Sequence, residues 1–103
     1  MDPFKPWEPK TRRSAPPGLT VEDARALALR AVVFIAADDD ELLPRFVALT
    51  GCDLDDMRRR IADDAFLGGV LDFILGFEPT LLAFVAAEGI AAELPALARG
   101  KLP

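Results

Sequence analysis

The sequence contains no histidine, no tyrosine and a single cysteine, Cys52, among its 103 residues. Without histidine, the chain lacks the commonest metal ligand and the side chain best suited to proton transfer near neutral pH. A single cysteine excludes an intramolecular disulfide framework, and no Cys–His nucleophile pair can form. We therefore predict a protein that is not an enzyme, with no catalytic residues, no metal and no cofactor, in the reducing environment of the cytoplasm.

Long apolar runs are also missing. The longest, residues 66–77, has 12 residues and is interrupted by Asp72, whereas a membrane-spanning helix needs about 20. The first residues lack the apolar run of a signal peptide. No four-residue run alternates between apolar and polar residues and is flanked by turn residues, as a strand would be. These absences predict a soluble, all-α protein with no membrane contact.

Prolines and basic residues are concentrated at the start of the chain. Residues 1–18 hold five of the nine prolines and four Lys/Arg against two Asp/Glu, a net charge of +2. Proline frustrates both helix and sheet hydrogen bonding, so we expect a disordered, basic, proline-rich arm. Residues 19–103 hold eight Lys/Arg against fifteen Asp/Glu, a net charge of −7. We expect them to form one helical domain that repels nucleic acid and anionic membranes.

Helix start and stop signals divide this domain into a compact bundle of five to six short helices. Thr20 and Asp23 form a capping-box pattern before a helix that ends near Ala37. The acidic run 38–41 suits the start of the next helix, at about residue 40, and Gly51 suits a left-handed position after Thr50. The remaining predicted helices cover about residues 54–62 after Asp53, 65–76 capped by Asp64, 80–88 before Gly89, and 92–99 with Pro95 near its start.

The sequence also repeats weakly when it is shifted by 38 residues. Seven residues of the first half recur in the second: Leu29, Val32, Leu43, Phe46, Val47, Ala48 and Gly51 match Leu67, Val70, Leu81, Phe84, Val85, Ala86 and Gly89. In the same alignment Val33 falls on Leu71 and Cys52 on Ile90. One interpretation is two pseudo-repeated three-helix units, 27–62 and 65–99, that close a single core. The other is convergent helix patterning. In either case, we predict that Cys52 is a buried structural thiol.

The most unusual pattern is a row of small residues around a carboxylate, Gly68, Asp72 and Gly76. A glycine inside a helix costs about 1 kcal/mol relative to alanine, so close packing against the backbone is expected there. The neighbour is either another helix of the same domain or a partner helix or second copy anchored by Asp72. The predicted partner-binding residues are Gly68, Asp72, Phe73, Gly76, Phe77 and Trp7 of the arm.

The preferred function is a non-enzymatic protein-interaction module, an adaptor or regulator that binds a protein partner or a second copy of itself. The alternative is a nucleic-acid-binding regulator that uses Lys5, Lys10, Arg12, Arg13 and Arg58 to Arg60. Three consecutive arginines on a helix point in three directions. Asp55 and Asp56 are also spaced to pair with Arg59 and Arg60 at i,i+4, which disfavours nucleic acid. A small enzyme would need a cleft with perturbed carboxylates.

The block from Leu42 to Leu82 resembles a family of small alphaproteobacterial proteins known as domain of unknown function 3572. The resemblance rests on F-V-A-L-T-G at residues 46–51, D-x-x-F-L-x-x-V-L-D-F-I-L at 63–75 and E-P-x-L-L-x-F at 78–84. It extends over about residues 20–100 and leaves the arm outside. It implies an all-helical, cytoplasmic bacterial protein, with no assigned activity and no catalytic residues to carry over.

Overall fold

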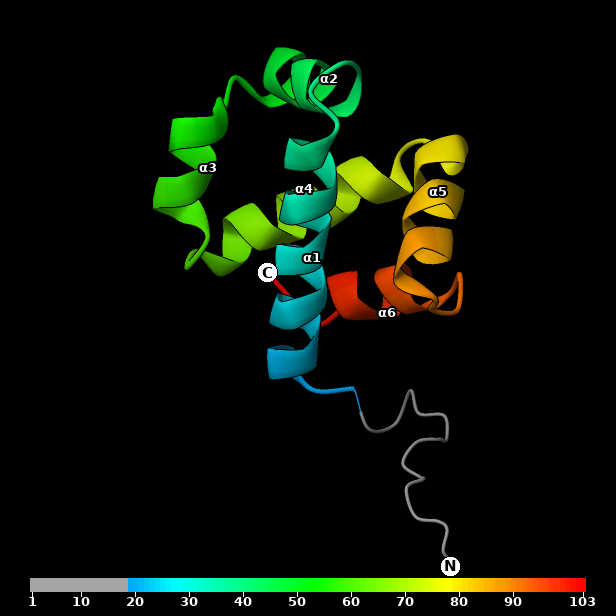
Figure 1. Ribbon diagram of the computed structural model, residues 1–103. Coiled ribbons are helices and arrows are strands. Elements are labelled where there is room, and N and C mark those ends of the chain that lie inside the picture. Colours follow the sequence, from blue (N-terminus) through cyan, green and yellow to red (C-terminus); the bar gives the residue numbers. More distant parts are fainter. Residues whose placement is uncertain (1–18) are drawn as a thin grey trace, which may run out of the picture.

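The computed structural model describes residues 19–103, which form six helices and no strand (Figure 1). The predicted all-α bundle of five to six helices is confirmed. The helices are α1 (Val21–Ala37), α2 (Leu42–Thr50), α3 (Leu54–Arg60), α4 (Asp64–Leu75), α5 (Glu78–Glu88) and α6 (Leu94–Arg99).

The crossing of α1 and α4 is the centre of the bundle. α1 packs against α2, α4 and α6, and α4 packs against α1, α5 and α6. Figure 1 shows α3 on one side of this crossing and α5 and α6 on the other. The buried face of α1 includes Ala24, Ala28 and Ala31, whose small side chains let a neighbouring helix approach closely. Large buried side chains, among them Phe46 and Phe84, fill the remaining core.

Most local helix signals are present as predicted. The side chain of Thr20 accepts a hydrogen bond from the Asp23 backbone N–H, and Asp23 accepts one from the Thr20 N–H, both at 3.0 Å. Asp53 caps α3 in the same reciprocal way. Gly51 and Gly89 end α2 and α5 with φ values of 75° and 67°. These left-handed conformations suit glycine because it has no Cβ.

Several predicted helix boundaries are wrong by one or two residues. Asp63, not Asp64, caps α4, which starts at residue 64. α2 starts at Leu42 rather than residue 40, because the Asp38 side chain accepts the Glu41 backbone N–H and holds residues 39–41 in a turn. In addition, α3 ends at Arg60 rather than residue 62, α5 starts at Glu78 rather than residue 80, and α6 starts at Leu94 rather than residue 92.

The weak 38-residue repeat predicts the order of the elements better than it predicts their packing. Each half contains two helices, a left-handed glycine and a third helix. However, α6 packs against both α1 and α4, whereas α3 approaches no other helix to a comparable extent. Cys52 is buried as predicted, while its counterpart Ile90 is only half-buried. The two units are therefore not equivalent in space.

No single helix within residues 19–103 has the length and apolar character needed to cross a membrane. Only α4 and α5 taken together pass such a test, and the chain bends by 107° between them.

Candidate interaction surface

In the predicted row of Gly68, Asp72 and Gly76, Gly68 is covered by another part of the chain, while Asp72 and Gly76 are exposed. Gly68 is buried, and a Cβ added there would lie 2.8 Å from the Pro103 carbonyl oxygen and 3.0 Å from Arg99 Nη1. A Cβ at Gly76 would instead meet its own helix, 3.2 Å from the carbonyl oxygen of Asp72. The close neighbour of Gly68 is thus the end of the same chain, which corresponds to the intradomain interpretation of this row.

Arg99 holds that end of the chain against α4. Its Nε donates to Asp72 Oδ1 at 2.7 Å, and its Nη1 donates to the carbonyl oxygens of Leu102 at 3.1 Å and Pro103 at 3.0 Å. The hydrogen bond to Asp72 raises the pKa of the Arg99 guanidinium above its ordinary value. A partner that used Asp72 as an anchor would have to displace this contact.

The two predicted phenylalanines have different surroundings. Phe73 is half-buried and packs edge to face on Phe46, with 5.2 Å between the ring centroids. Phe77 is 50% exposed at the start of α5. The Arg45 guanidinium lies over both rings, 5.5 Å from the centroid of Phe73 and 4.7 Å from that of Phe77. The sixth predicted residue, Trp7, lies outside the described residues.

Arg45, which no sequence pattern singles out, joins α2 to the start of α5. Its Nη2 donates to Oγ1 of the buried Thr80 at 2.7 Å, 35 residues away in the chain. The two side chains help to line a hollow of about 210 Å³ between the end of α1, α2 and the start of α5. Nothing in the sequence spacing relates Arg45 to Thr80, so this contact had no local signal.

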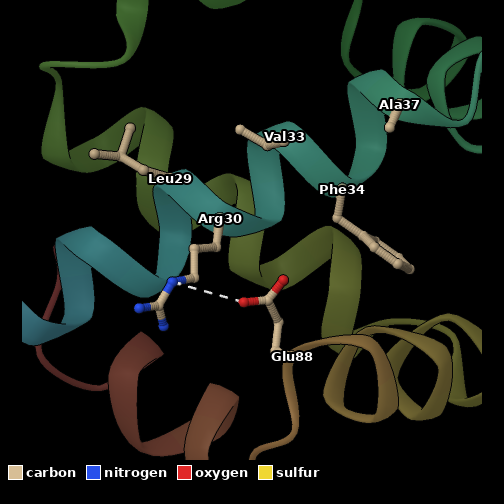
Figure 2. A pocket seen from close by; sticks show the side chains of 6 residues that line it. All are labelled: Leu29, Arg30, Val33, Phe34, Ala37 and Glu88. Carbon is tan, nitrogen blue, oxygen red and sulfur yellow. Dashed lines mark ion pairs between the residues drawn. The ribbon is translucent and has the colours of Figure 1, made fainter.

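A second, larger hollow of about 420 Å³ lies between α1 and the end of α5, and we refer to it as the α1–α5 groove. Figure 2 shows Leu29, Val33 and Ala37 along one edge of α1, with Arg30 and Phe34 directed toward α5. The four-residue spacing of the first three places them on one helix face. Val33 is 68% exposed and Leu29 is 38% exposed. The exposed edge of α1 is therefore apolar.

Two contacts hold the groove in shape. Arg30 Nε lies 3.6 Å from Glu88 Oε1 and ties the middle of α1 to the last residue of α5 (Figure 2). Phe34 packs edge to face on the buried Phe84 of α5, with 5.3 Å between ring centroids. Phe34 also lines the smaller hollow, so one side chain is shared by both. The groove thus has an aromatic wall that is anchored in the core.

This groove is not evident from the sequence, because its apolar residues resemble core residues. In the 38-residue alignment Val33 corresponds to Leu71, which is fully buried, whereas Val33 is mostly exposed. The available signal was a second apolar stripe on α1, Leu29, Val33 and Ala37, in addition to the stripe that faces the core. A helix that is apolar on more than one face has an apolar surface left over after its core packing.

Two of the three arginines of α3 are paired along their own helix. Arg58 Nη1 lies 3.2 Å from Asp55 Oδ1, and Arg59 is hydrogen-bonded to Asp56. These pairs are spaced i,i+3, so the predicted i,i+4 pairing is wrong. The backbone hydrogen bond from Asp53 lowers the pKa of Asp56, and Arg59 contributes less. The arm residues Lys5, Lys10, Arg12 and Arg13, which the nucleic-acid alternative also requires, lie outside the described residues.

Within residues 19–103, no group of three or more His, Cys, Asp and Glu side chains is placed to hold a metal ion. In comparisons with known proteins, the sequence profile of a family described as protein of unknown function (DUF3572) matches residues 21–103. No curated protein and no solved structure matches the chain.

Proposed function

The chain belongs to the DUF3572 family of proteins of unknown function, and from that starting point we propose that it is a non-enzymatic interaction module whose binding site is the α1–α5 groove. The observation that supports this proposal most directly is Val33, which is 68% exposed between Leu29 and Ala37. Single exposed apolar residues are common on protein surfaces, but an apolar stripe beside a groove is typical of binding sites.

The energetics favour a partner with apolar side chains. Full burial of a valine or leucine side chain contributes about 1.5–3 kcal/mol, so covering Val33 and Leu29 would stabilise a complex. The ring of Phe34 offers further apolar contact area, and its packing on Phe84 means that little ordering is needed on binding. We prefer this surface to the predicted row, because Gly68 is covered by Arg99 and Pro103 and the exposed Asp72 is already hydrogen-bonded to Arg99.

The charges around the groove favour a partner that also carries basic groups. Four acidic residues, Asp38 to Glu41, follow Ala37 directly at one end of the groove, whereas Glu88 in the wall is paired with Arg30. Opposite charges across an interface speed association and select among partners. An adaptor or regulator that acts in the bacterial cytoplasm is part of the same proposal. The single cysteine, which is buried, suits a reducing compartment.

The test compares Val33→Glu with Leu49→Glu as bait for proteins of the native host, with bound proteins identified by mass spectrometry. Leu49 lies on α2, is 71% exposed and does not line the groove, so it is a matched control. A carboxylate buried against an apolar partner is costly. We therefore expect Val33→Glu to recover at least about tenfold less partner than the wild type, which corresponds to about 1.4 kcal/mol of binding free energy. Equal recovery by both variants and the wild type would refute the proposal.

A further inference from the structure

We propose that residues 1–18 of the chain itself occupy the α1–α5 groove, with the indole ring of Trp7 against Leu29, Val33 and Phe34. The arm would then compete with any outside partner for the groove. This inference rests on the proposed function in so far as both use the same surface.

The reach is sufficient because the arm joins the helix that carries the groove. Leu19 and Thr20 directly precede α1. Trp7 is separated from Leu19 by 12 peptide units, which span at most about 40 Å. From Val21 to Val33 the helix advances by only about 18 Å. A path back along α1 is therefore about half as long as the chain that could follow it.

The side chains of the arm fit an apolar groove with an aromatic wall. Phe4 and Trp7 alternate with Pro3, Pro6 and Pro9. Proline has no backbone N–H, so a segment rich in proline leaves fewer donors unsatisfied when it lies on an apolar surface. Proline-rich segments commonly bind in grooves lined by aromatic side chains. Tryptophan brings the largest apolar area of any residue, together with one N–H that can stay at the rim.

The charges are complementary as well. The arm carries a net charge of +2 and residues 19–103 a net charge of −7. Lys5 and Lys10 flank Trp7, while the acidic run 38–41 adjoins the groove, whose own Glu88 is paired with Arg30. Contact between these groups is favourable at low ionic strength and is screened by salt. Binding of the arm should therefore weaken as salt is added.

A second copy of α1 fits the groove less well than the arm. Acidic residues stand at both ends of α1, Glu22 and Asp23 in its first turn and residues 38–41 after its last. Antiparallel or parallel pairing of two α1 helices would therefore bring like charges together at the ends. Repulsion of this kind disfavours association.

The sequence supplies its own probe, because Trp7 is the only tryptophan and there is no tyrosine. In the full chain we expect Trp7 to emit at shorter wavelength than in the urea-unfolded protein, and to be less accessible to acrylamide. Val33→Glu should shift both readings to those of the unfolded chain, while circular dichroism shows that the helices remain. Leu49→Glu should leave them unchanged, and added salt should move them toward the unfolded values.

Three outcomes would overturn the inference: an exposed Trp7 in the folded wild type, an equally buried Trp7 in Val33→Glu, or burial that grows with protein concentration, which would indicate a second copy. The two proposals fail separately. If Trp7 is exposed but Val33→Glu still loses its partner, only the inference about the arm is wrong. If Trp7 is buried against Val33 and Trp7→Ala still captures no partner, only the proposed function is wrong.

Discussion

Gly68 and Gly69 are neighbours on α4 but have very different surroundings. A Cβ at Gly68 would collide with the Pro103 carbonyl oxygen and the Arg99 guanidinium, whereas a Cβ at Gly69 would meet nothing within 4 Å. Gly68 is buried and Gly69 is exposed. Packing therefore requires a glycine at position 68. At position 69 a glycine destabilises the helix through its backbone entropy, and nothing in the described residues would clash with a larger side chain there.

These two glycines make a matched pair of substitutions. Gly69→Ala should raise the free energy of unfolding by about 0.5–1 kcal/mol, because alanine is the better helix former. Gly68→Ala gains the same propensity but must push aside Arg99 and Pro103, and such overpacking costs about 1–3 kcal/mol. Urea denaturation of both variants measures the difference. Equal stabilisation by the two changes would show that the C-terminal residues do not rest on Gly68.

At the scale of the element, α3 depends most on its ends. It has only seven residues and contributes one buried side chain, Met57. It packs on no other helix to the extent that α6 packs on α1 and α4. A helix this short is not stable in isolation. The reciprocal hydrogen bonds between Asp53 and Asp56 therefore matter more here than the equivalent box of Thr20 and Asp23 does for the 17-residue α1.

Removal of this cap should act locally. Asp53→Ala should cost about 1 kcal/mol and should increase amide hydrogen exchange chiefly in α3, because the rest of the core is unchanged. Asp55→Ala is the control, since Asp55 lies in the first turn of the same helix and pairs only with the exposed Arg58 among the described residues. Exchange that rises equally in all helices would contradict a local role for the cap.

For the whole molecule, one ion pair connects the start of α1 to the start of α4. Arg25 Nε and Nη2 donate to Asp64 Oδ1 and Oδ2, each at 2.8 Å, in a bidentate arrangement. The hydrogen bonds from Arg25 lower the pKa of Asp64 below its ordinary value. A carboxyl whose pKa is lowered on folding stabilises the folded state above its unfolded pKa. That contribution is lost as the pH falls through the folded-state pKa.

The pH dependence of this pair follows from the sign of the shift. At pH 7, Asp64→Asn should be less stable than the wild type, and the difference should shrink as the pH falls below about 4, the ordinary pKa of an aspartate. Thermal unfolding at a series of pH values measures this. In an Arg25→Gln background, Asp64→Asn should have no such pH-dependent effect. A gap that persists unchanged down to low pH would mean that the ion pair is not its cause.

Signals that act within one helical turn could be predicted from the sequence. The capping box of Thr20 and Asp23, the cap at Asp53 and the glycines that end α2 and α5 depend on contacts between residues at most four apart. Helix boundaries are harder to predict from the sequence where two neighbouring residues can both serve as a cap. Asp63 and Asp64 are chemically equivalent N-caps, and the choice between them goes with the bond from Arg25 to Asp64, 39 residues apart.

The sequence by itself determined that residues 19–103 are all-helical and where most of their turns lie, because capping, proline and glycine act through neighbouring backbone groups. Only the tertiary structure decided which apolar faces remain uncovered. Gly68 is covered by Pro103, 35 positions further along the chain, while Val33 is exposed although its repeat counterpart Leu71 is buried. Periodicity identifies a face as apolar, but what packs on that face depends on contacts between segments far apart in the sequence.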